Sequence, residues 1–506
     1  MKKLITLLLS LLMAFSLCFT AACSDNDANT ADFVVGSAKD ADDDYSSNEG
    51  DTEVDTGNND DAVTVDDSDG YTVYTITTAG TYTFSNTLYG RIVVDAGEDD
   101  EVIIVLDGCT INSTDNSCIF AVNADNVKVK AQSGTYNQLN DNRSAKTVEV
   151  ADQGEGAISA KCDLSIVGQG SLTVNANYNN GIHTTKDLKI KNATVKVTAP
   201  NNAIKGKDNV NILSGNLIAI STMGDGMKTE NTDISSKGNQ RGSITITGGT
   251  VNIYAAGDGI QAAYNFVMED DGDSTIAEPT VEIFTGSYSN YTASSAATDS
   301  YKGIKVENEL GIACGNIILH TYDDGLHANY GTAFENGSTG LGKITISGGT
   351  ITDNVYSPST SAGNGGGMGW GGQQTVTGAD GIHSDNTLTI SGGTVKIQSA
   401  YEGLEANHII ISGGTTYVYA TDDGINASKK INQTPSIVVS GGYLDVTVSS
   451  GDVDGIDSNG SYTQSGGIVI TRGQPGGADG NMAALDCDGT ATFTGGTLIA
   501  FGGIGA

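Results

Sequence analysis

Short runs in which apolar and polar residues alternate recur along most of this chain, and glycine-rich turns separate them. The clearest unit lies between Gly378 and Ser428, where an acidic residue and Gly precede an alternating run, a Ser-Gly-Gly-Thr turn and a second alternating run. Alternation with a period of two is typical of strands that bury one face. The leading Gly falls at Gly381, Gly403 and Gly424. A repeat of about 22 residues is typical of stacked coils.

The same unit can be followed over most of the sequence. Its leading Gly or Ala occurs at Gly156, Gly181, Ala203, Gly226, Gly259, Gly303, Gly325, Gly381, Gly403, Gly424 and Gly455. Longer steps between these positions indicate loops inserted at residues 262–300 and 354–377. Residues 70–154 alternate without the repeat signature, as expected of an N-terminal cap and first coils, because the end of a solenoid must cover its strands.

We therefore predict an all-β protein in which residues 155–506 form a right-handed parallel β-helix. Three short strands fit each repeat, and the repeats indicate a solenoid of about a dozen coils. The hand follows from the general preference for right-handed crossovers between parallel strands. In register, Ile382, Leu404 and Ile425 form an interior column, whereas Lys396 and Tyr417 face outward.

The N-terminus has the pattern of an export signal. Lys2 and Lys3 precede an apolar run, and small residues lead to Cys23. We predict a lipoprotein signal peptide over residues 1–22 and a lipid anchor on Cys23, which places the protein outside the cytoplasm, on the bacterial membrane or cell surface. Ordinary secretion with cleavage nearby is the alternative. Residues 23–69 are acidic with little apolar periodicity, so we expect a disordered tether.

The excess of acidic residues indicates which partners and cofactors suit this chain. The chain has 61 Asp and Glu against 25 Lys and Arg, a formal net charge of −36. This argues against nucleic acid, which requires a basic surface. Acidic residues gather directly before the repeat Gly, and hard oxygen ligands crowded at turns favour calcium. The predicted calcium ligands are Asp225, Asp258, Asp324, Asp380, Glu402, Asp423 and Asp454. The alternative is structural, because Asp or Asn before Gly stabilises a tight turn.

Basic side chains align three residues after this acid. A straight ladder of polar groups matches an extended polymer, so we predict that it binds polysaccharide. Outward tyrosines can add stacking against sugar rings. The predicted carbohydrate-binding residues are His183, Lys205, Lys228, Lys305, His327, His383, Tyr254, Tyr417 and Tyr419. The alternative is a solvated ladder without a ligand, with the tyrosines packed against their neighbours.

The cysteines and Trp370 add little evidence about function. Cys109 and Cys118 flank a plausible turn, so they either form a disulfide or remain buried thiols. Trp370 lies in a Gly-rich segment, where it belongs to a mobile loop or stacks on a sugar. We find no Ser-His-Asp, Cys-His or zinc-binding spacing.

Several long segments resemble a known family. These are AGTYTFSNTLYGRIVVDAGEDDEVIIVLDGCTI, GAISAKCDLSIVGQGSLTVNANYNNGIHTTKDLKI, NNAIKGKDNVNI and GDGMKTEN. The chain resembles, over roughly residues 70–506, the bacterial surface carbohydrate-binding β-helix family, which is pectate-lyase-like in fold. The resemblance implies a right-handed β-helix that holds calcium and binds cellulose or polygalacturonate without demonstrated cleavage.

The sequence thus favours a noncatalytic, monomeric, carbohydrate-binding surface lipoprotein that contains calcium. A calcium-dependent polysaccharide lyase is the first alternative, with Lys228 or Lys305 as the base that removes a proton beside a uronate carboxylate. A surface adhesin rod with protein partners is the second. The chain stops at GGTLIAFGGIGA without a polar closing segment, so we expect either a truncated end or one that another chain completes.

Overall fold

The computed structural model describes residues 51–53, 62–68, 70–150, 152–273, 275–286, 300–356, 378–449, 453–473 and 483–504. The predicted signal peptide, Cys23, Trp370 and most of the predicted tether lie outside the described residues. The described part is built from strands and turns, and it contains no helix of the length and apolar character needed to cross a bilayer. The prediction of an all-β protein is confirmed.

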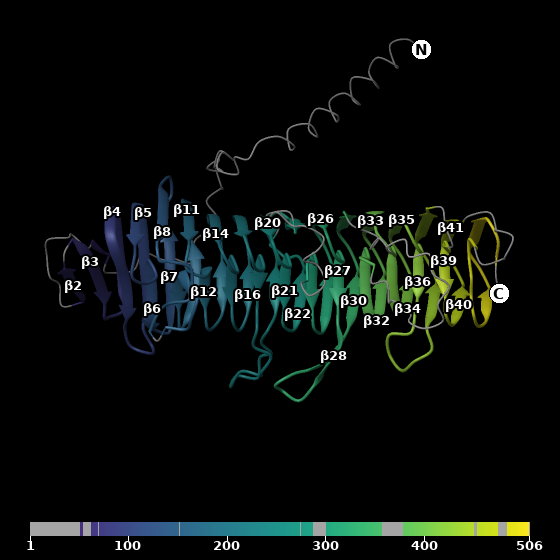
Figure 1. Cartoon of the computed structure of the whole chain (residues 1–506), viewed down its shortest axis with the longest axis horizontal. Coiled ribbons are helices and arrows are strands. Elements are labelled where there is room, and N and C mark those ends of the chain that lie inside the picture. Colours follow the sequence, from purple (N-terminus) through teal and green to yellow (C-terminus); the bar gives the residue numbers. More distant parts are fainter. Residues whose placement is uncertain are drawn as a thin grey trace, which may run out of the picture. The chain divides into compact units, whose positions relative to one another are not determined.

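Most strands belong to one long, mainly parallel sheet, and each pairs with a counterpart in the next repeat (Figure 1). Three ladders result. The first ladder contains β6 (Ile119–Asn123), β9 (Gly156–Ala160), β12 (Asn180–Thr184), β15 (Ile204–Gly206), β18 (Met227–Lys228), β21 (Ile260–Ala262), β24 (Ile304–Val306), β27 (Leu326–Ala328), β32 (Ile382–Ile390), β34 (Leu404–Ile411), β36 (Ile425–Ala427) and β39 (Ile456–Ser458).

The second ladder shares β32 and β34, which are long enough to serve both. Its other members are β7 (Asn126–Ala131), β10 (Asp163–Val167), β13 (Leu188–Ile190), β16 (Val210–Ile212), β19 (Ile244–Ile246), β22 (Asn265–Met268), β25 (Glu309–Ile312), β30 (Lys343–Ile346), β37 (Ser436–Val439), β40 (Ser461–Gln464) and β42 (Ala491–Phe493).

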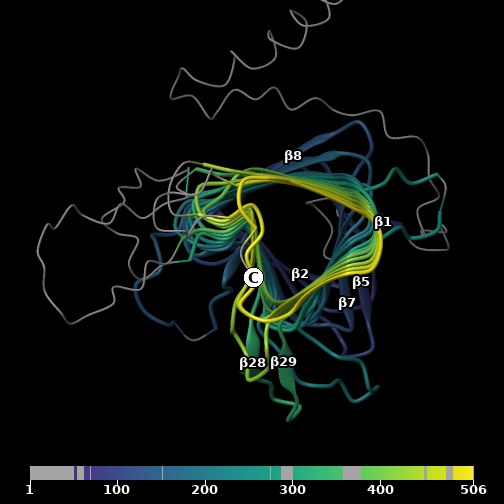
Figure 2. The ribbon, with the colours of Figure 1, turned by 90° about the vertical axis from the view of Figure 1, so that its right-hand side faces the viewer.

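The third ladder completes each repeat. It contains β8 (Tyr136–Asp141), β11 (Ser171–Ala176), β14 (Thr194–Ala199), β17 (Asn216–Ser221), β20 (Thr250–Ala255), β23 (Thr280–Thr285), β26 (Asn316–Thr321), β31 (Thr350–Val355), β33 (Thr394–Ser399), β35 (Thr415–Ala420), β38 (Tyr443–Val448), β41 (Ile468–Arg472) and β43 (Thr497–Phe501). Figure 2 shows strands from successive repeats lying behind one another around a common interior.

The first strands depart from this pattern. They are β1 (Asp51–Glu53), β2 (Val63–Ser68), β3 (Tyr71–Ile76), β4 (Gly80–Asp95) and β5 (Glu101–Ser113). β2 pairs antiparallel with β3, and β1 pairs in parallel with β4. Ordered structure therefore begins before residue 70, inside the predicted tether. A separate hairpin, β28 (Tyr330–Ala333) with β29 (Thr339–Leu341), projects between β27 and β30.

The predicted insertion over residues 262–300 differs from the structure in its described part. β22 and β23 lie within this range and pair in register with β25 and β26. They are regular members of the second and third ladders rather than an inserted loop. Of the predicted insertion at 354–377, residues 357–377 lie outside the described part.

The interior is apolar, as the alternation predicts. Ile382, Leu404, Ile425 and Ile456 are successive Cα partners in the first ladder, and each side chain is fully buried. One hydrophobic cluster runs through the repeats from Val63 to Cys487. Cys109 and Cys118 are both buried free thiols, so the structure has the second of the two predicted alternatives.

The repeat glycine is required by close packing. A Cβ atom on Gly226 would lie 2.2 Å from Ile253 Cγ2 and 2.6 Å from the carbonyl oxygen of Gly259 in the next repeat. These distances are too short for a larger side chain at Gly226, although Ala203 occupies the same corner of the preceding repeat. The second Gly of the Gly-Gly-Thr turn is needed for its backbone conformation. Gly393 has a φ of +72°, which residues with a side chain rarely adopt.

Candidate functional site

The aligned polar positions of the first ladder form one continuous line, which we call the outer column. Its members are successive Cα partners from each strand to the next: His183, Lys205, Lys228, Gln261, Lys305, His327, His383, Glu405, Asn426 and Asp457. The six predicted His and Lys side chains are therefore brought together along one edge. Their proposed role in carbohydrate binding stays a prediction.

The outer column is less exposed than a solvated ladder would be. His183 and His327 are only 7% and 8% exposed. Burial, with a contribution from nearby Lys205, lowers the pKa of His183 to about 4, so this imidazole is neutral at pH 7. The sequence correctly indicates that these side chains point away from the apolar interior. It does not show that neighbouring side chains cover them.

In three repeats, a carboxylate two residues after the outer-column residue provides part of this cover. Lys205 Nζ lies 2.7 Å from Glu230 Oε1, and Lys305 Nζ lies 3.7 Å from Glu307 Oε1. Sequence analysis missed Asp385 as a neighbour of the outer column. The available signal was an acid two positions after a His or Lys, on the same face of the strand.

The residues before the repeat Gly form a second line, the turn column. In each of several repeats, one side-chain oxygen accepts the backbone N–H of the turn residue in the next repeat. Asp225 Oδ1 accepts from Asp258 N at 2.9 Å, and Asp324 Oδ1 accepts from Asp380 N at 2.7 Å. Asp423 Oδ1 accepts from Asp454 N at 2.8 Å. These residues therefore stabilise the turns, as the structural alternative predicts. The second carboxylate oxygen of each remains for other partners.

The predicted tyrosines lie on the third ladder and thus on a different strand of each repeat from the outer column. Tyr254 stacks on Phe284, with centroids 5.1 Å apart and an interplanar angle of 2°, and Phe284 stacks on His320 at 4.4 Å. Tyr417 and Tyr419 are 43% and 42% exposed. The tyrosines and the basic side chains do not form one contact surface, and Tyr254 packs against a neighbour as its alternative predicts.

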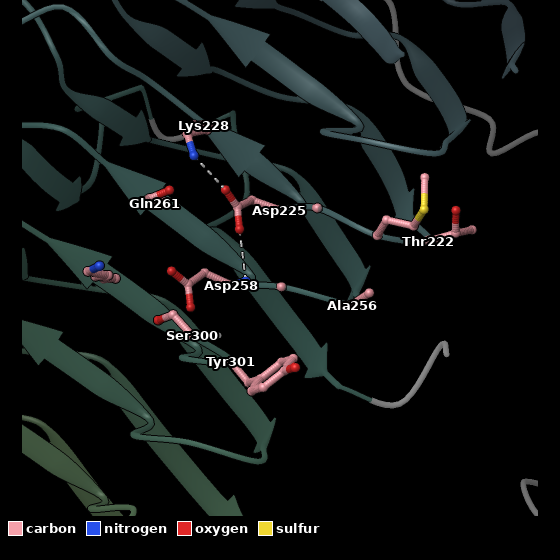
Figure 3. Close-up of a pocket in the computed structure, with 12 residues that line it drawn as sticks. Thr222, Asp225, Lys228, Ala256, Asp258, Gln261, Ser300 and Tyr301 are labelled. Atoms are coloured by element: carbon pink, nitrogen blue, oxygen red, sulfur yellow. Dashed lines mark hydrogen bonds and ion pairs between the residues drawn. The ribbon is translucent and has the colours of Figure 1, made fainter. Parts of the chain in front are cut away.

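A cavity of about 430 Å³ lies at the corner between the third and first ladders. Its lining includes Asp225, Lys228, Asp258, Gln261, Tyr301 and Lys305. Figure 3 shows Asp225 between Lys228 and Asp258, with Gln261 and Tyr301 nearby. The cavity combines basic and acidic members of the outer and turn columns. Here the predicted binding line has space for a ligand.

The charges in this cavity are only partly compensated. Lys228 Nζ donates to Asp225 Oδ2 at 3.0 Å. Burial, and then the charge of Asp225, raises the pKa of Asp258 to about 6. Two carboxylates and two lysines at one opening can offer donors and acceptors together, which suits hydroxyl and carboxylate groups of a sugar.

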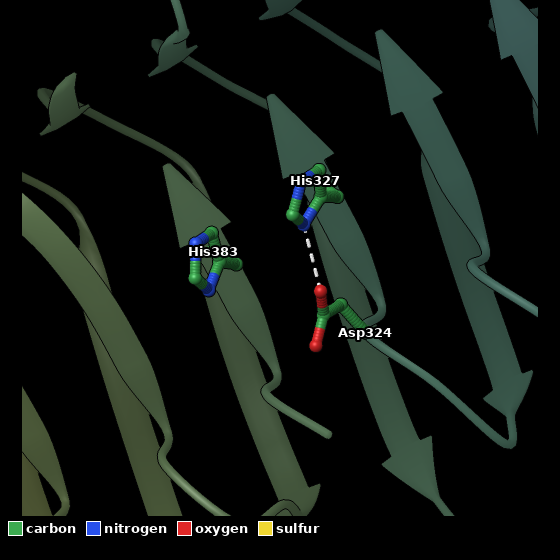
Figure 4. A group of neighbouring side chains, drawn as sticks. All are labelled: Asp324, His327 and His383. Atoms are coloured by element: carbon green, nitrogen blue, oxygen red, sulfur yellow. Dashed lines mark hydrogen bonds and ion pairs between the residues drawn. The ribbon is translucent and has the colours of Figure 1, made fainter. Parts of the chain in front are cut away.

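A second polar cluster lies further along the same column. His327 and His383 stack at 4.6 Å with an interplanar angle of 15°, as neighbouring strands place them (Figure 4). His327 Nδ1 lies 2.7 Å from Asp324 Oδ2. His383 Nδ1 lies 2.9 Å from Asp380 Oδ2. Burial, together with the charges of Asp324 and of a nearby glutamate, raises the pKa of Asp380 to about 8.

A third cluster, near the end of the described chain, contains only carboxylates. Ligand oxygens of Asp454, Asp457 and Asp486 all lie within 4.8 Å of one another. Burial and the charges of Asp454 and Asp486 raise the pKa of Asp457 to about 6. An all-oxygen donor set crowded at a turn fits calcium. Of the seven predicted calcium ligands, Asp454 alone belongs to this all-oxygen group.

Three of the other predicted ligands have nearby cations or histidines. Asp225 contacts Lys228, and Asp324 lies 2.9 Å from Lys302 Nζ. Asp380 is in contact with His383. Hence the turn column is not one uniform row of calcium ligands, because its partners change from repeat to repeat.

The repeated strands and the charged corner define a class of extended all-β proteins with a ligand-sized cavity along one edge. A family model described as "Carbohydrate-binding domain-containing protein" matches residues 69–355 and 367–501. Since this match extends over well more than half of the chain, the chain belongs to that family. The predicted resemblance to a carbohydrate-binding family is confirmed at this level.

One curated relative and one solved structure are similar to parts of this chain. A carbohydrate-binding domain-containing protein from Acetivibrio thermocellus is 40% identical over 145 residues, covering 28% of this chain and 51% of the relative. The match thus spans about half the length of that relative. A solved structure, a gadolinium derivative of the polysaccharide lyase-like protein from C. thermocellum, is 35% identical, with a TM-score of 0.40 and coverage of 45% of this chain and 86% of that chain.

Proposed function

We propose that this protein is a noncatalytic, surface-held binder of polysaccharide, and that a uronate polymer such as polygalacturonate enters the corner cavity. One observation carries the proposal: Lys228, Gln261 and Lys305 are consecutive Cα partners that line a single opening. Strands are about 4.8 Å apart, so the two lysines are separated by about 10 Å along the column. Each ammonium can contact a carboxylate of an extended acidic polymer, with the Gln261 amide between them.

The proposal also includes the parallel β-helix architecture and the location of the protein outside the cytoplasm. Three parallel ladders around one apolar interior support a parallel β-helix, and the right hand rests on the general crossover preference. A lipid on Cys23 would hold the chain outside the cytoplasm, and the acidic segment after it would act as a spacer. Cellulose remains an alternative ligand, for which the exposed faces of Tyr417 and Tyr419 offer stacking surfaces.

We place calcium at the Asp454, Asp457 and Asp486 cluster, where the donor atoms are all oxygens. Calcium there would neutralise carboxylates that otherwise repel one another at close range. Its role is to stabilise the last repeats, since the cluster is several strands from the corner cavity. In this proposal, calcium stabilises the fold and does not contact the polysaccharide.

A polysaccharide lyase is the second candidate, and the presence of Lys228 and Lys305 beside Asp225 and Asp258 favours it. A lyase base must accept the proton next to a uronate carboxylate. Lys228 instead donates to Asp225 Oδ2 in an ion pair, which is the role of an ammonium group and not of a base, and its remaining N–H groups can still contact a polymer carboxylate. Binding without cleavage therefore accounts better for this geometry.

Retention on immobilised polygalacturonate and on cellulose tests the proposal, with absorbance of unsaturated product followed in the same samples. We expect retention on polygalacturonate that weakens with salt, without a rise in absorbance. A steady rise that Lys228→Ala or Lys305→Ala abolishes would establish the lyase instead. Absence of retention on every polysaccharide tested would overturn carbohydrate binding through this cavity.

A further inference from the structure

Two successive repeats carry the same short motif, in which Asp and His are separated by Gly and an aliphatic residue. The motif is Asp324-Gly-Leu-His327 in one repeat and Asp380-Gly-Ile-His383 in the next. The turn thus places an acid and an imidazole on the same edge twice. Because β27 and β32 are paired in register, His327 is the direct Cα partner of His383.

The side chains converge on a small volume. Donor atoms of Asp324, His327 and His383 all lie within 4.8 Å of one another, and so do those of Asp380, His383 and Glu405. His383 Nδ1 is 2.8 Å from Glu405 Oε2. Zinc bonds of about 2.0–2.2 Å require neighbouring donors to be roughly 3.3 Å apart. Spreading these contacts by about half an ångström would therefore admit an ion.

Three buried carboxyl groups lie in this cluster, and two of them are paired with lysines. Asp324 is in contact with Lys302, and Glu405 is in contact with Lys430. For Asp380, the ion pair found among the described residues is with His383. Buried carboxylates are costly without paired charge or a metal. A divalent cation at this place would pair with these carboxylates as the lysines do.

An unpaired acceptor adjoins the cluster. The Oε2 atom of Glu402 is buried and has no hydrogen-bond partner among the described residues, although Oε1 accepts from Asn426. Buried polar atoms rarely lack a partner in proteins, and those that do often face a bound ion or water. Glu402 follows Asp380 in the turn column, so this oxygen lies in the repeat next to the Asp380–His383 pair.

We propose that His327, His383 and the carboxylates of Asp324, Asp380 and Glu405 form a binding site for one divalent transition metal of the zinc class. Imidazole nitrogens suit zinc, nickel, cobalt and copper, whereas calcium takes oxygen ligands. This donor set therefore differs in kind from the all-oxygen cluster at Asp454, Asp457 and Asp486. The metal would join β27, β32 and β34 and stabilise three successive repeats. The site does not depend on the proposed carbohydrate function.

The test uses the full chain, without an added histidine tag, after treatment with chelator. Titration calorimetry with Zn²⁺ should show one strong site per chain, and Co²⁺ should give the visible absorption of a cobalt ion with nitrogen and oxygen ligands. His327→Gln and His383→Gln should each weaken Zn²⁺ binding by tenfold or more. Excess Ca²⁺ should not displace the bound Zn²⁺.

His408→Gln is the matched control. His408 lies on β34 but bonds to Ser436 and Gln433, away from the cluster, so this variant should bind Zn²⁺ as the original chain does. Asp380→Asn retains both imidazoles and provides a second measurement if a histidine variant fails to fold. Zn²⁺ binding that is absent, unchanged in His327→Gln, His383→Gln and Asp380→Asn, or equally weakened in His408→Gln would overturn the proposal. The cluster would then be an ion-pair network only.

Discussion

Lys228 and Asp225 are joined by an ion pair of 3.0 Å across the mouth of the corner cavity, while the other oxygen of Asp225 binds the backbone of the next repeat. The turn thus fixes the carboxylate, and the carboxylate orients the lysine. Lys228 on β18 consequently has a defined position in the lining of the cavity, which also includes Lys305 on β24. This rigidity lowers the entropic cost of binding an extended polymer.

Lys228→Ala and Lys305→Ala should each weaken binding to polygalacturonate by about tenfold, because each removes one charge-assisted hydrogen bond worth about 1.4 kcal/mol or more. Affinity electrophoresis against the soluble polymer measures this directly. Lys189→Ala, an exposed change on β13, serves as the control and should bind normally. If both cavity variants bind as tightly as the original chain, the cavity is not the contact site.

Removal of calcium should lower the thermal midpoint of unfolding, and Asp457→Asn should abolish that response. A calcium concentration 100 times the dissociation constant would add about 2.7 kcal/mol to the free energy of unfolding. Calorimetric scans with and without a calcium-selective chelator provide the measurement. Asp107→Asn, at an exposed position on β5, should retain the full calcium response. A shift of equal size in Asp457→Asn would place the ion elsewhere.

Asp353 should make stability depend on pH. This side chain is fully buried in β31 between Leu319 and Ile397, and neither carboxylate oxygen has a hydrogen-bond partner among the described residues. Burial raises the pKa of Asp353 well above its usual value. The folded state therefore holds the proton more tightly than the unfolded state. The contribution of this proton to the free energy of unfolding is complete below the ordinary aspartate pKa. It is lost as pH rises through the raised pKa of Asp353.

Asp353→Leu should remove this dependence and increase the free energy of unfolding at neutral pH by about 1–3 kcal/mol, the usual cost of an unpaired buried polar group. Denaturant titrations between pH 4 and pH 9 compare the two chains. Asp107→Asn is again a suitable control. A less stable Asp353→Leu chain at neutral pH would show that the carboxylate has a favourable partner.

Gly403→Ala should destabilise the fold by about 1–3 kcal/mol, as overpacked positions typically do. The new Cβ would lie 2.1 Å from Val418 Cγ1 and 2.4 Å from the carbonyl oxygen of Gly424. Gly311→Ala on β25 is the matched control, since its new Cβ would have nothing within 4 Å. Comparable loss of stability in both variants would mean that strand propensity, rather than packing at the repeat corner, sets the need for Gly.

The interior was predictable because side-chain direction alternates along a strand. That rule correctly placed Ile382 and Leu404 inside, and it aligned His327 with His383 once the repeats were in register. Beyond β21 the expected Gly-Gly-Thr turn is replaced by Pro279 and Thr280, so β22 and β23 were assigned to a loop. Pairing with adjacent repeats holds these strands in place without that turn signal.

The chemistry of the site was only partly accessible from the sequence. Glu230 and Asp385 cover the outer column, but their contacts depend on side-chain conformations that alternation does not specify. The sequence aligned His327 with His383 but did not show that Asp324 and Asp380 contact these histidines, because those contacts also depend on side-chain conformation. Asp353 was missed because a carboxylate in an apolar column contradicts the rule used to find the column.

The amide-to-carboxylate bonds of the turn column have a direction. At most steps between Asn202 and Ala483, the later residue donates its N–H to the side chain of the earlier one, as in the bonds from Asp258 to Asp225 and from Ala483 to Asp454. A completed repeat therefore presents an acceptor to the repeat that follows it. Because a ribosome releases the N-terminal part first, each finished turn can serve as a template for the next while the chain is still being synthesised.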